Sequence, residues 1–262
     1  MKTFTELQEG VYDPNILKAF FLAGGPGSGK SYVVRKTTGG LGLKVVNSDD
    51  AFEKGLKDAG LSLKMPDEEE AARDPVRARA KKLTGMKKDN YIDGRLGLVI
   101  DGTGKDYDKI ASQATKLKQL GYDVHMIFVN TSLDTALERN QKRDRSVPES
   151  IVIKSWKDVQ SNIGKFSQYF RRNFVVVDNN DSEEDVMGPV FKQVMSLAKR
   201  KVQNPAGKAW IAGELEMKKD AAGSGKTGTG GRFGPGRRQR IDPEKLAKIK
   251  KGGFSRFARR TG

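Results

Sequence analysis

A glycine-rich segment near the N-terminus combines residue types that bind phosphate groups. It completes the pattern G-x-x-x-x-G-K-[ST] and reads Gly24-Gly25-Pro26-Gly27-Ser28-Gly29-Lys30-Ser31. Glycines let a tight loop turn its backbone N–H groups inward, where they bind phosphate oxygens. In this pattern Lys30 reaches the outer phosphates and Ser31 offers its hydroxyl to Mg²⁺. The segment therefore predicts a site for a nucleoside triphosphate such as ATP.

Acidic residues follow two of the predicted strands. Asp49 comes after the run at 43–47, and Asp101 directly follows Leu98-Val99-Ile100. A carboxylate at position 49 can accept the proton of a hydroxyl that attacks the γ-phosphate, as a kinase requires. Asp101 is placed like a carboxylate that supports Mg²⁺. The alternatives are an N-cap at position 49 or 50 and a loop-initiating Asp at 101.

Positive charge gathers further along the chain, in Arg139-Asn140-Gln141-Lys142-Arg143-Asp144-Arg145, ahead of Val147-Pro148. On a helix, Arg139 and Arg143 share a face, so both could reach one phosphate group. Arginine suits a phosphoryl group because its planar fork binds two oxygens at once. We expect this segment to form a lid over the phosphates. A solvated helix end is the alternative.

The elements that must position these residues alternate between strand-like and helical patterns. This alternation predicts an α/β fold with a mostly parallel sheet. Five strands are expected, at 19–23, 43–47, 96–101, 123–129 and 174–178. Helices are expected after the glycine-rich loop and at about 51–90, 110–117, 131 onward and 181–201. Ligands of such sheets bind at the carboxyl ends of the strands, where the loop and the acidic residues fall. The prediction is a three-layer P-loop NTPase fold.

Composition narrows the possible chemistry. The chain has 262 residues, no cysteine and one histidine. Without thiols it has no disulfides and no thiolate metal site, which fits a reducing cytoplasm. No apolar run reaches the ~18 residues that a membrane span needs. His125 lies within an apparent buried strand and is interpreted as a core or strand-end residue, so zinc and Ser/His chemistry are poor candidates.

Charge divides the chain into a body and a basic tail. Residues 203–262 carry 15 Lys/Arg against 5 Asp/Glu, so ten of the 16 net positive charges lie there. This part is also rich in glycine, which predicts a mobile, low-complexity segment. We therefore expect a kinase domain at 1–203 and a largely disordered tail at 204–262. Phenylalanines among its arginines favour contact with nucleic acid, although an acidic protein partner or a solubilising role would also fit.

Together these residues resemble the kinase domain of bacteriophage polynucleotide kinases and, more broadly, the P-loop kinases that include zeta-type toxins. The matching features keep their order over about residues 18–170. They are the loop at 24–31, Asn47-Ser48-Asp49-Asp50, Val99-Ile100-Asp101-Gly102-Thr103, and Arg139-Asn140-Gln141-Lys142-Arg143 before Val147-Pro148.

The resemblance implies roles for particular residues. Asp49 would activate a 5′-hydroxyl, Lys30 with Arg139 and Arg143 would hold the ATP phosphates, and Asp101 would support the site near the metal. The chain departs from the phage pattern at Phe52, where that family has an arginine that engages the phosphate of the acceptor. It also lacks the D-x-D-G-T signature of the accompanying phosphatase domain, since Val99 stands where the first Asp belongs.

Three functions remain open on the sequence. The first is an ATP-dependent kinase that phosphorylates an alcohol, with a polynucleotide 5′-hydroxyl as the leading acceptor. The second is a kinase of a small molecule such as a nucleotide sugar, which Phe52 favours. The third is a nucleotide-responsive protein that binds nucleic acid without catalysis.

Overall fold

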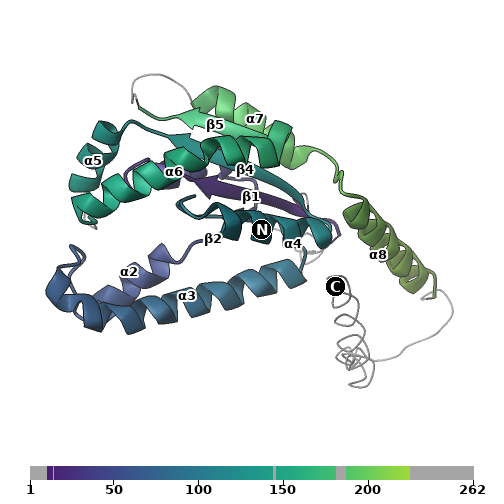
Figure 1. The fold of residues 1–262 in the computed structure, drawn as a ribbon. Coiled ribbons are helices and arrows are strands. Elements are labelled where there is room, and N and C mark those ends of the chain that lie inside the picture. The colour runs from purple at the N-terminus through teal and green to yellow at the C-terminus, as the bar shows by residue number, and fades with distance from the viewer. Residues whose placement is uncertain (1–10, 14, 144–145, 181–186, 225–262) are drawn as a thin grey trace, which may run out of the picture. The chain divides into compact units, whose positions relative to one another are not determined.

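The computed structural model describes residues 11–13, 15–143, 146–180 and 187–224 (Figure 1). The strands are β1 (Lys18–Ala23), β2 (Lys44–Val46), β3 (Leu98–Ile100), β4 (Asp123–Asn130) and β5 (Phe174–Asp178). The helices are α1 (Lys30–Thr38), α2 (Asp49–Asp58), α3 (Glu70–Asp93), α4 (Tyr107–Gln119), α5 (Leu133–Gln141), α6 (Glu149–Phe170), α7 (Met187–Lys199) and α8 (Pro205–Ser224), with short 3₁₀ turns at Asp67–Glu69 and Arg171–Asn173.

The five strands form one sheet in the order β2-β3-β1-β4-β5, and every neighbouring pair is parallel. This confirms the predicted α/β fold. Because the chain leaves β1 toward β2 and later returns to its other side for β4, the strand order reverses beside β1. Parallel sheets bind ligands outside the carboxyl ends of the strands at such a reversal.

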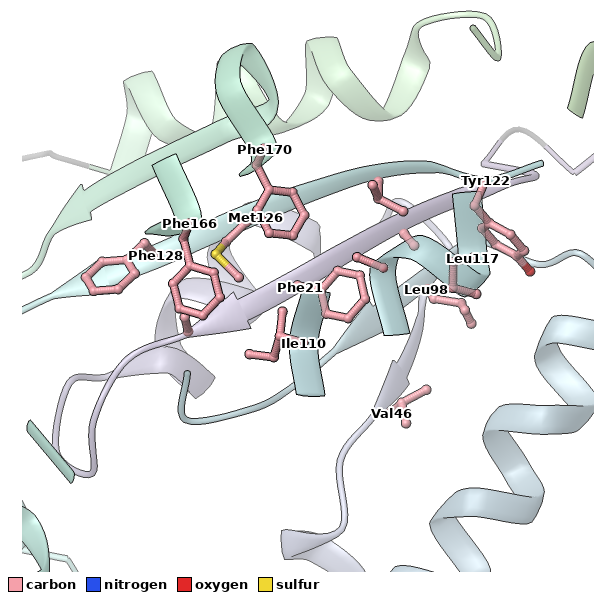
Figure 2. Close-up of a cluster of buried hydrophobic side chains, with 14 of the residues drawn as sticks. Phe21, Val46, Leu98, Ile110, Leu117, Tyr122, Met126, Phe128, Phe166 and Phe170 are labelled. Carbon is pink, nitrogen blue, oxygen red and sulfur yellow. The ribbon is translucent and has the colours of Figure 1, made fainter. Parts of the chain in front are cut away.

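Helices cover both faces of the sheet and make three layers. On one face, Phe21 and Met126 pack under α4 and α6, which contribute Ile110, Phe166 and Phe170 to the core (Figure 2). On the other face, the alternate strand residues pack against α1 and α7. Both faces of each central strand are therefore buried, which is why β1 and β4 are almost continuously apolar.

The polar region expected to be helical at 51–90 forms two helices that pack side by side, α2 and α3 (Figure 1). They share a small apolar core of their own, made of Phe52, Leu56, Met65 and Ala80. The turn between them ends at Glu69, whose carboxylate accepts a hydrogen bond from the backbone N–H of Ser62. This pair of helices forms a wall beyond the carboxyl end of β2.

The structure differs from the expected domain boundary at 203/204. Helix α8 begins at Pro205, and its residues Trp210 and Ile211 pack against the main core. Asn204 precedes it and accepts a hydrogen bond from the N–H of Ala206, a helix start with Pro at the first helical position. The internal contacts divide the chain after Lys218 instead. The expectations for the tail beyond Ser224, including its contact with nucleic acid, lie outside the described residues.

None of the helices in the described part of the chain is long and apolar enough to cross a membrane.

Candidate active site

The glycine-rich loop connects β1 to α1 and has the backbone conformation that its glycines permit. Gly24, Gly27 and Gly29 have backbone φ values of 153°, 79° and 81°, which L-residues with a side chain rarely adopt. A Cβ at Gly24 would also lie 2.8 Å from the carbonyl oxygen of Val129. Gly29 is the N-cap of α1, so the positive end of that helix dipole faces the loop. The loop therefore has the form of an anion-binding cradle.

Lys30 lies across this cradle. Its Nζ donates hydrogen bonds to the carbonyl oxygens of Gly24 at 2.7 Å and Gly25 at 3.1 Å. Asn179, which follows β5, supports the loop from below, because its Nδ2 donates to the carbonyl oxygen of Ser28 at 2.8 Å. The lysine is thus held by the same loop whose N–H groups would receive phosphate.

Asp49 and Asp101 follow the carboxyl ends of two neighbouring strands, β2 and β3. Asp49 is the first residue of α2, and its backbone N–H donates to Oδ1 of Asn47 at 2.8 Å. The Nδ2 of Asn47 donates to Oδ2 of Asp101 at 2.9 Å. Since Ser48 is the N-cap of α2, neither Asp49 nor Asp50 has the capping role that was the alternative. One asparagine therefore joins the two acidic positions.

These residues enclose a cavity of about 410 Å³, which we call the loop cavity. It is lined by Pro26, Gly27, Gly29, Lys30, Ser31, Asn47, Ser48, Asp49, Met65, Arg77, Asp101, Gly102, Thr103, Lys105, Arg143, Val147, Ile151 and Ser155. The structure thus brings Lys30, Ser31, Asp49, Asp101 and Arg143 to one hollow. Asp49 and Lys30 therefore line the same cavity at the carboxyl ends of the strands.

The charges inside the loop cavity affect one another. Burial lowers the pKa of Lys30, and the carboxylates of Asp101 and Asp49 oppose that effect. Burial also raises the pKa of Asp101, while Lys30 lowers it and the charges of Asp49 and Asp50 raise it further. These mutual effects indicate that Lys30, Asp101 and Asp49 lie close enough to interact electrostatically, with Lys30 and Asp101 partly buried and Asp49 exposed.

The two arginines of the expected lid do not share a helical face. Helix α5 ends at Gln141, and the side chain of Asn140 exchanges two hydrogen bonds with the backbone of Val147, which closes the loop between them. Arg143 comes after the end of α5 and lines the loop cavity. Arg139 instead donates to the carbonyl oxygens of Asn179 at 2.6 Å and Asn180 at 3.3 Å. In the described structure Arg139 braces the loop after β5 rather than lining the cavity.

The residues present fit a Mg²⁺ ion that is held together with phosphate oxygens. Asp101 Oδ1 is buried and has no hydrogen-bond partner among the described residues. Ser31 supplies a hydroxyl to the same cavity. The described residues contain no group of three or more His, Cys, Asp or Glu that could hold a metal alone. Mg²⁺ is commonly bound by one or two protein oxygens plus substrate phosphates, which matches this donor set.

Sequence patterns assigned no role to three residues that the structure places at or beside the site: Asn47, Asn179 and Arg77. Both asparagines directly follow a strand of the parallel sheet, which is a signal that could have found them. Arg77 comes from α3, and its guanidinium lies over the ring of Phe52, 4.4 Å from the ring centre. It carried no local signal because its position depends on the packing of α3 against α2.

Comparison with solved structures finds similar chains of low sequence identity. A protein from Chloroflexus aurantiacus that is proposed to be a kinase is 16% identical, with a TM-score of 0.49 over 72% of this chain and 98% of its own. A chain of the AvrRxo1-ORF1:AvrRxo1-ORF2 complex with sulphate ions is 15% identical, with a TM-score of 0.50 over 69% and 64%. A chain of the Pnkp1/Rnl/Hen1 RNA repair complex is 18% identical, with a TM-score of 0.46 over 63% and 49%. At such identities the likeness is one of fold.

No curated protein matches the sequence. The model of the zeta toxin family, however, matches residues 7–187, well over half of the chain. The matched range includes the glycine-rich loop, both acidic positions and Arg143. The resemblance expected from the motifs is confirmed, and the chain belongs to the zeta toxin family of P-loop kinases.

Proposed function

We propose that the protein transfers the γ-phosphoryl group of ATP to an alcohol. The observation that carries this proposal is that Asp49 and Lys30 line one cavity, close enough for the carboxylate to oppose the lowering of the lysine pKa. The phosphate loop binds the nucleotide on one side of the cavity. The Asp49 carboxylate lines the same cavity, which an acceptor hydroxyl would enter.

Each residue of the site has a part in this transfer. The oxygen of the acceptor forms a bond to the γ-phosphorus while its proton passes to a carboxylate oxygen of Asp49. The bond between the γ-phosphorus and the oxygen that bridges it to the β-phosphate breaks, and that oxygen leaves on ADP with the electron pair. Lys30 and Arg143 bind the phosphoryl oxygens as negative charge shifts toward ADP.

Mg²⁺ would be held by Ser31 and Asp101, and it supplies positive charge that neutralises the phosphates. Asn47 orients the Asp101 carboxylate through the bond to Oδ2, which leaves Oδ1 available. Met65, Val147 and Ile151 add apolar surface to the cavity wall and limit access of water to the transferred group.

The test is transfer of labelled phosphate from ATP to two acceptor classes, a 5′-hydroxyl oligonucleotide and a panel of nucleotide sugars. Asp49→Asn keeps the size of the side chain and removes its ability to accept the proton. We expect the variant to lose at least about a hundredfold in transfer rate while it still binds ATP. Asp50→Asn is the matched control, because Asp50 is in the same helical turn and does not line the loop cavity. Full transfer activity in Asp49→Asn would refute the role of Asp49 as the base.

A further inference from the structure

A groove of about 540 Å³ lies at the end of the sheet opposite to the phosphate loop. Ile16 and Lys18, at the start of β1, line it, whereas the phosphate loop follows Ala23, the last residue of β1. We call it the α8 groove, because α8 forms one of its walls. It shares no lining residue with the loop cavity. A ligand in this groove would therefore leave the nucleotide site free.

Hydrogen bonds and a close backbone contact fix the start of α8 against the sheet. The Asp123 carboxylate accepts the backbone N–H groups of Gln203 and Asn204, both at 2.8 Å. In the first turn of α8, Gly207 lies so close to the backbone of Gly121 that a Cβ at either position would overlap the other residue. The groove beside α8 is therefore formed before any ligand binds.

The walls of the α8 groove present apolar side chains. Helix α8 contributes Ile211, Ala212 and Leu215, which share one helical face because position 215 is four and three residues beyond the other two. Ile16 and Val202 complete the apolar surface. Ala212 is exposed, and Ile211 and Leu215 are only half-buried. An apolar group in the groove would remove this surface from water, which is favourable.

Positive charge borders the same apolar surface. Lys199, Arg200 and Lys201 line the groove at and after the end of α7, and Lys208 lines it from α8. All four are exposed, and no Asp or Glu among the described residues lines the groove. The ion pairs in the described part of the chain include none of the four. The groove thus carries positive charge that no carboxylate of its own neutralises.

Helix stability explains only part of this charge. Cations at the C-terminal end of α7 interact favourably with its helix dipole, which accounts for Lys199 and its neighbours. Lys208 completes the first turn of α8, where the positive end of the dipole disfavours a cation. Its position therefore favours a role outside the helix, which is to supply positive charge to the groove.

We propose that the α8 groove binds a small amphiphilic anion, a molecule with an apolar body and an anionic head group. The body packs on Ile211 and Leu215, and the head group lies between Arg200 and Lys208 on the two walls. This inference goes beyond the kinase function and does not depend on it.

Size and charge favour this occupant over a protein. The volume of the groove falls within the roughly 300–1,000 Å³ of small-molecule sites. Eleven residues line it, whereas a stable protein–protein interface uses about 20–30 residues on each side. A second copy of the chain is disfavoured, because each chain carries a net charge of +16.

The first test is calorimetry of the full chain with four ligands that have similar alkyl chains and different head groups, each below its micelle concentration: decanoate, decyl phosphate, decyl glucoside and decyltrimethylammonium. We expect saturable binding of an anion, and the tighter of the two anions identifies the head group. The neutral glucoside should bind at least about tenfold more weakly, and the cation more weakly still. No saturable binding of either anion, or equal binding of the cation, overturns the proposal.

A pair of double variants tests the cationic walls. Arg200→Gln/Lys208→Gln removes one charge from each wall of the groove. Lys116→Gln/Lys192→Gln removes the same net charge from exposed positions that line neither this groove nor the loop cavity. The first should weaken binding of the anion at least about tenfold, and the second should bind it like the parent. Equal affinities in the two variants would contradict the assigned head-group site.

A pair of tryptophan variants tests the apolar wall. Ala212→Trp fills the groove, and Ala209→Trp places the same side chain at an exposed position of α8 that does not line it. Both positions are exposed, so both proteins should keep a Tm close to that of the parent. Ala212→Trp alone should lose binding of the anion, while both keep the parent affinity for ATP. Undiminished binding in Ala212→Trp would place the ligand outside the groove.

Two further measurements test other occupants. Light scattering over a range of protein concentrations detects a second copy of the chain, and dimers that only Ala212→Trp abolishes would assign the groove to self-association. A peptide of leucine and glutamate that binds the groove when neither anion does would assign it to an acidic protein. Either result overturns the proposal. Failure of phosphate transfer, by contrast, contradicts only the kinase proposal and leaves these binding results unchanged.

Discussion

Asn47 and Asp101 are joined by a hydrogen bond of 2.9 Å between the ends of two neighbouring strands. The same asparagine accepts the backbone N–H of Asp49. A single amide therefore sets the orientation of the proposed metal-supporting carboxylate and the start of the helix that carries the proposed base.

Asn47→Ala removes both hydrogen bonds and leaves the two acids in place. We expect kcat to fall about tenfold, which is typical when a residue that orients a metal ligand is lost. The apparent affinity for Mg²⁺ should fall with it. Titration of activity against Mg²⁺ measures both, and excess Mg²⁺ should restore part of the rate. An unchanged Mg²⁺ requirement would mean that Asn47 does not position Asp101.

The ionised Asp101 side chain lowers the free energy of unfolding at neutral pH, because burial raises the pKa of its carboxyl above the ordinary value. At neutral pH the folded protein holds a charge that the unfolded chain solvates better. Asp101→Asn should therefore raise Tm at pH 7 while it weakens Mg²⁺-dependent transfer. The gain in Tm should shrink as the pH falls through the raised pKa, because the parent side chain is then neutral too. Thermal melts of both proteins from pH 7 to pH 4 measure this difference.

The backbone of the site follows from the sequence better than the side chains do. Apolar runs bounded by turns predicted all five strands, and the glycines of the loop occupy the backbone conformations that their pattern implies. Asp49 and Asp101 also fall at the expected edge, because parallel strands bring their carboxyl ends together.

Long-range contacts limited the rest of the prediction. The partners of Arg139 are carbonyl groups 40 and 41 residues away, and no local pattern encodes them. Helix α8 was missed because its glycines suggest a linker, whereas Gly207 lets α8 approach Gly121 closely. Trp210 then packs on the core. For both Arg139 and α8, contacts with residues far away in the sequence determine where the residues lie.

Asn179 is expected to support nucleotide binding through the phosphate loop. It is 8% exposed, and its Nδ2 donates to the carbonyl oxygen of Ser28. Asn179→Ala leaves that carbonyl without its donor and should cost about 1–3 kcal/mol of unfolding free energy. Asn179→Asp should cost more, because a carboxylate oxygen then faces the carbonyl oxygen. Urea unfolding and the KM for ATP are the measurements, and equal effects of the two variants would contradict the inferred contact.

The buried ion pair of Lys18 and Asp123 anchors the segment that leads into α8. Lys18 Nζ lies 2.7 Å from Asp123 Oδ2, and their side chains are 2% and 10% exposed. The Asp123 carboxylate also accepts the backbone N–H groups of Gln203 and Asn204. Asp123→Ala should destabilise the fold by about 3–5 kcal/mol, since it leaves a buried ammonium without its partner.

Lys18→Met with Asp123→Ala separates the two contributions. The double variant should recover part of the loss, because the unpaired charge is gone while the contacts to Gln203 and Asn204 stay missing. Chemical denaturation gives the free energies. No recovery in the double variant would assign the whole effect to the backbone contacts.

His125 should give the fold an acid-sensitive component of stability. It is 3% exposed and stacks on Phe20 with ring centres 4.9 Å apart. Neither ring nitrogen has a hydrogen-bond partner among the described residues. Burial lowers its pKa from 6.5 to about 4, with a further contribution from the charge of Lys18. The folded protein therefore keeps the ring neutral at pH values where the unfolded chain protonates it.

As the pH falls from 6.5 to 4, the unfolded state binds a proton that the folded state refuses, so the free energy of unfolding declines by about 3 kcal/mol from this group alone. His125→Phe, which keeps an aromatic ring against Phe20, should remove that decline. His125→Leu should lack that decline too. Its free energy of unfolding should differ from that of His125→Phe by the same amount at every pH, because the two side chains pack differently. Denaturant unfolding at pH 7.5, 6 and 4.5 compares the three proteins, and parallel pH profiles for parent and variants would show that His125 is protonated in the folded state.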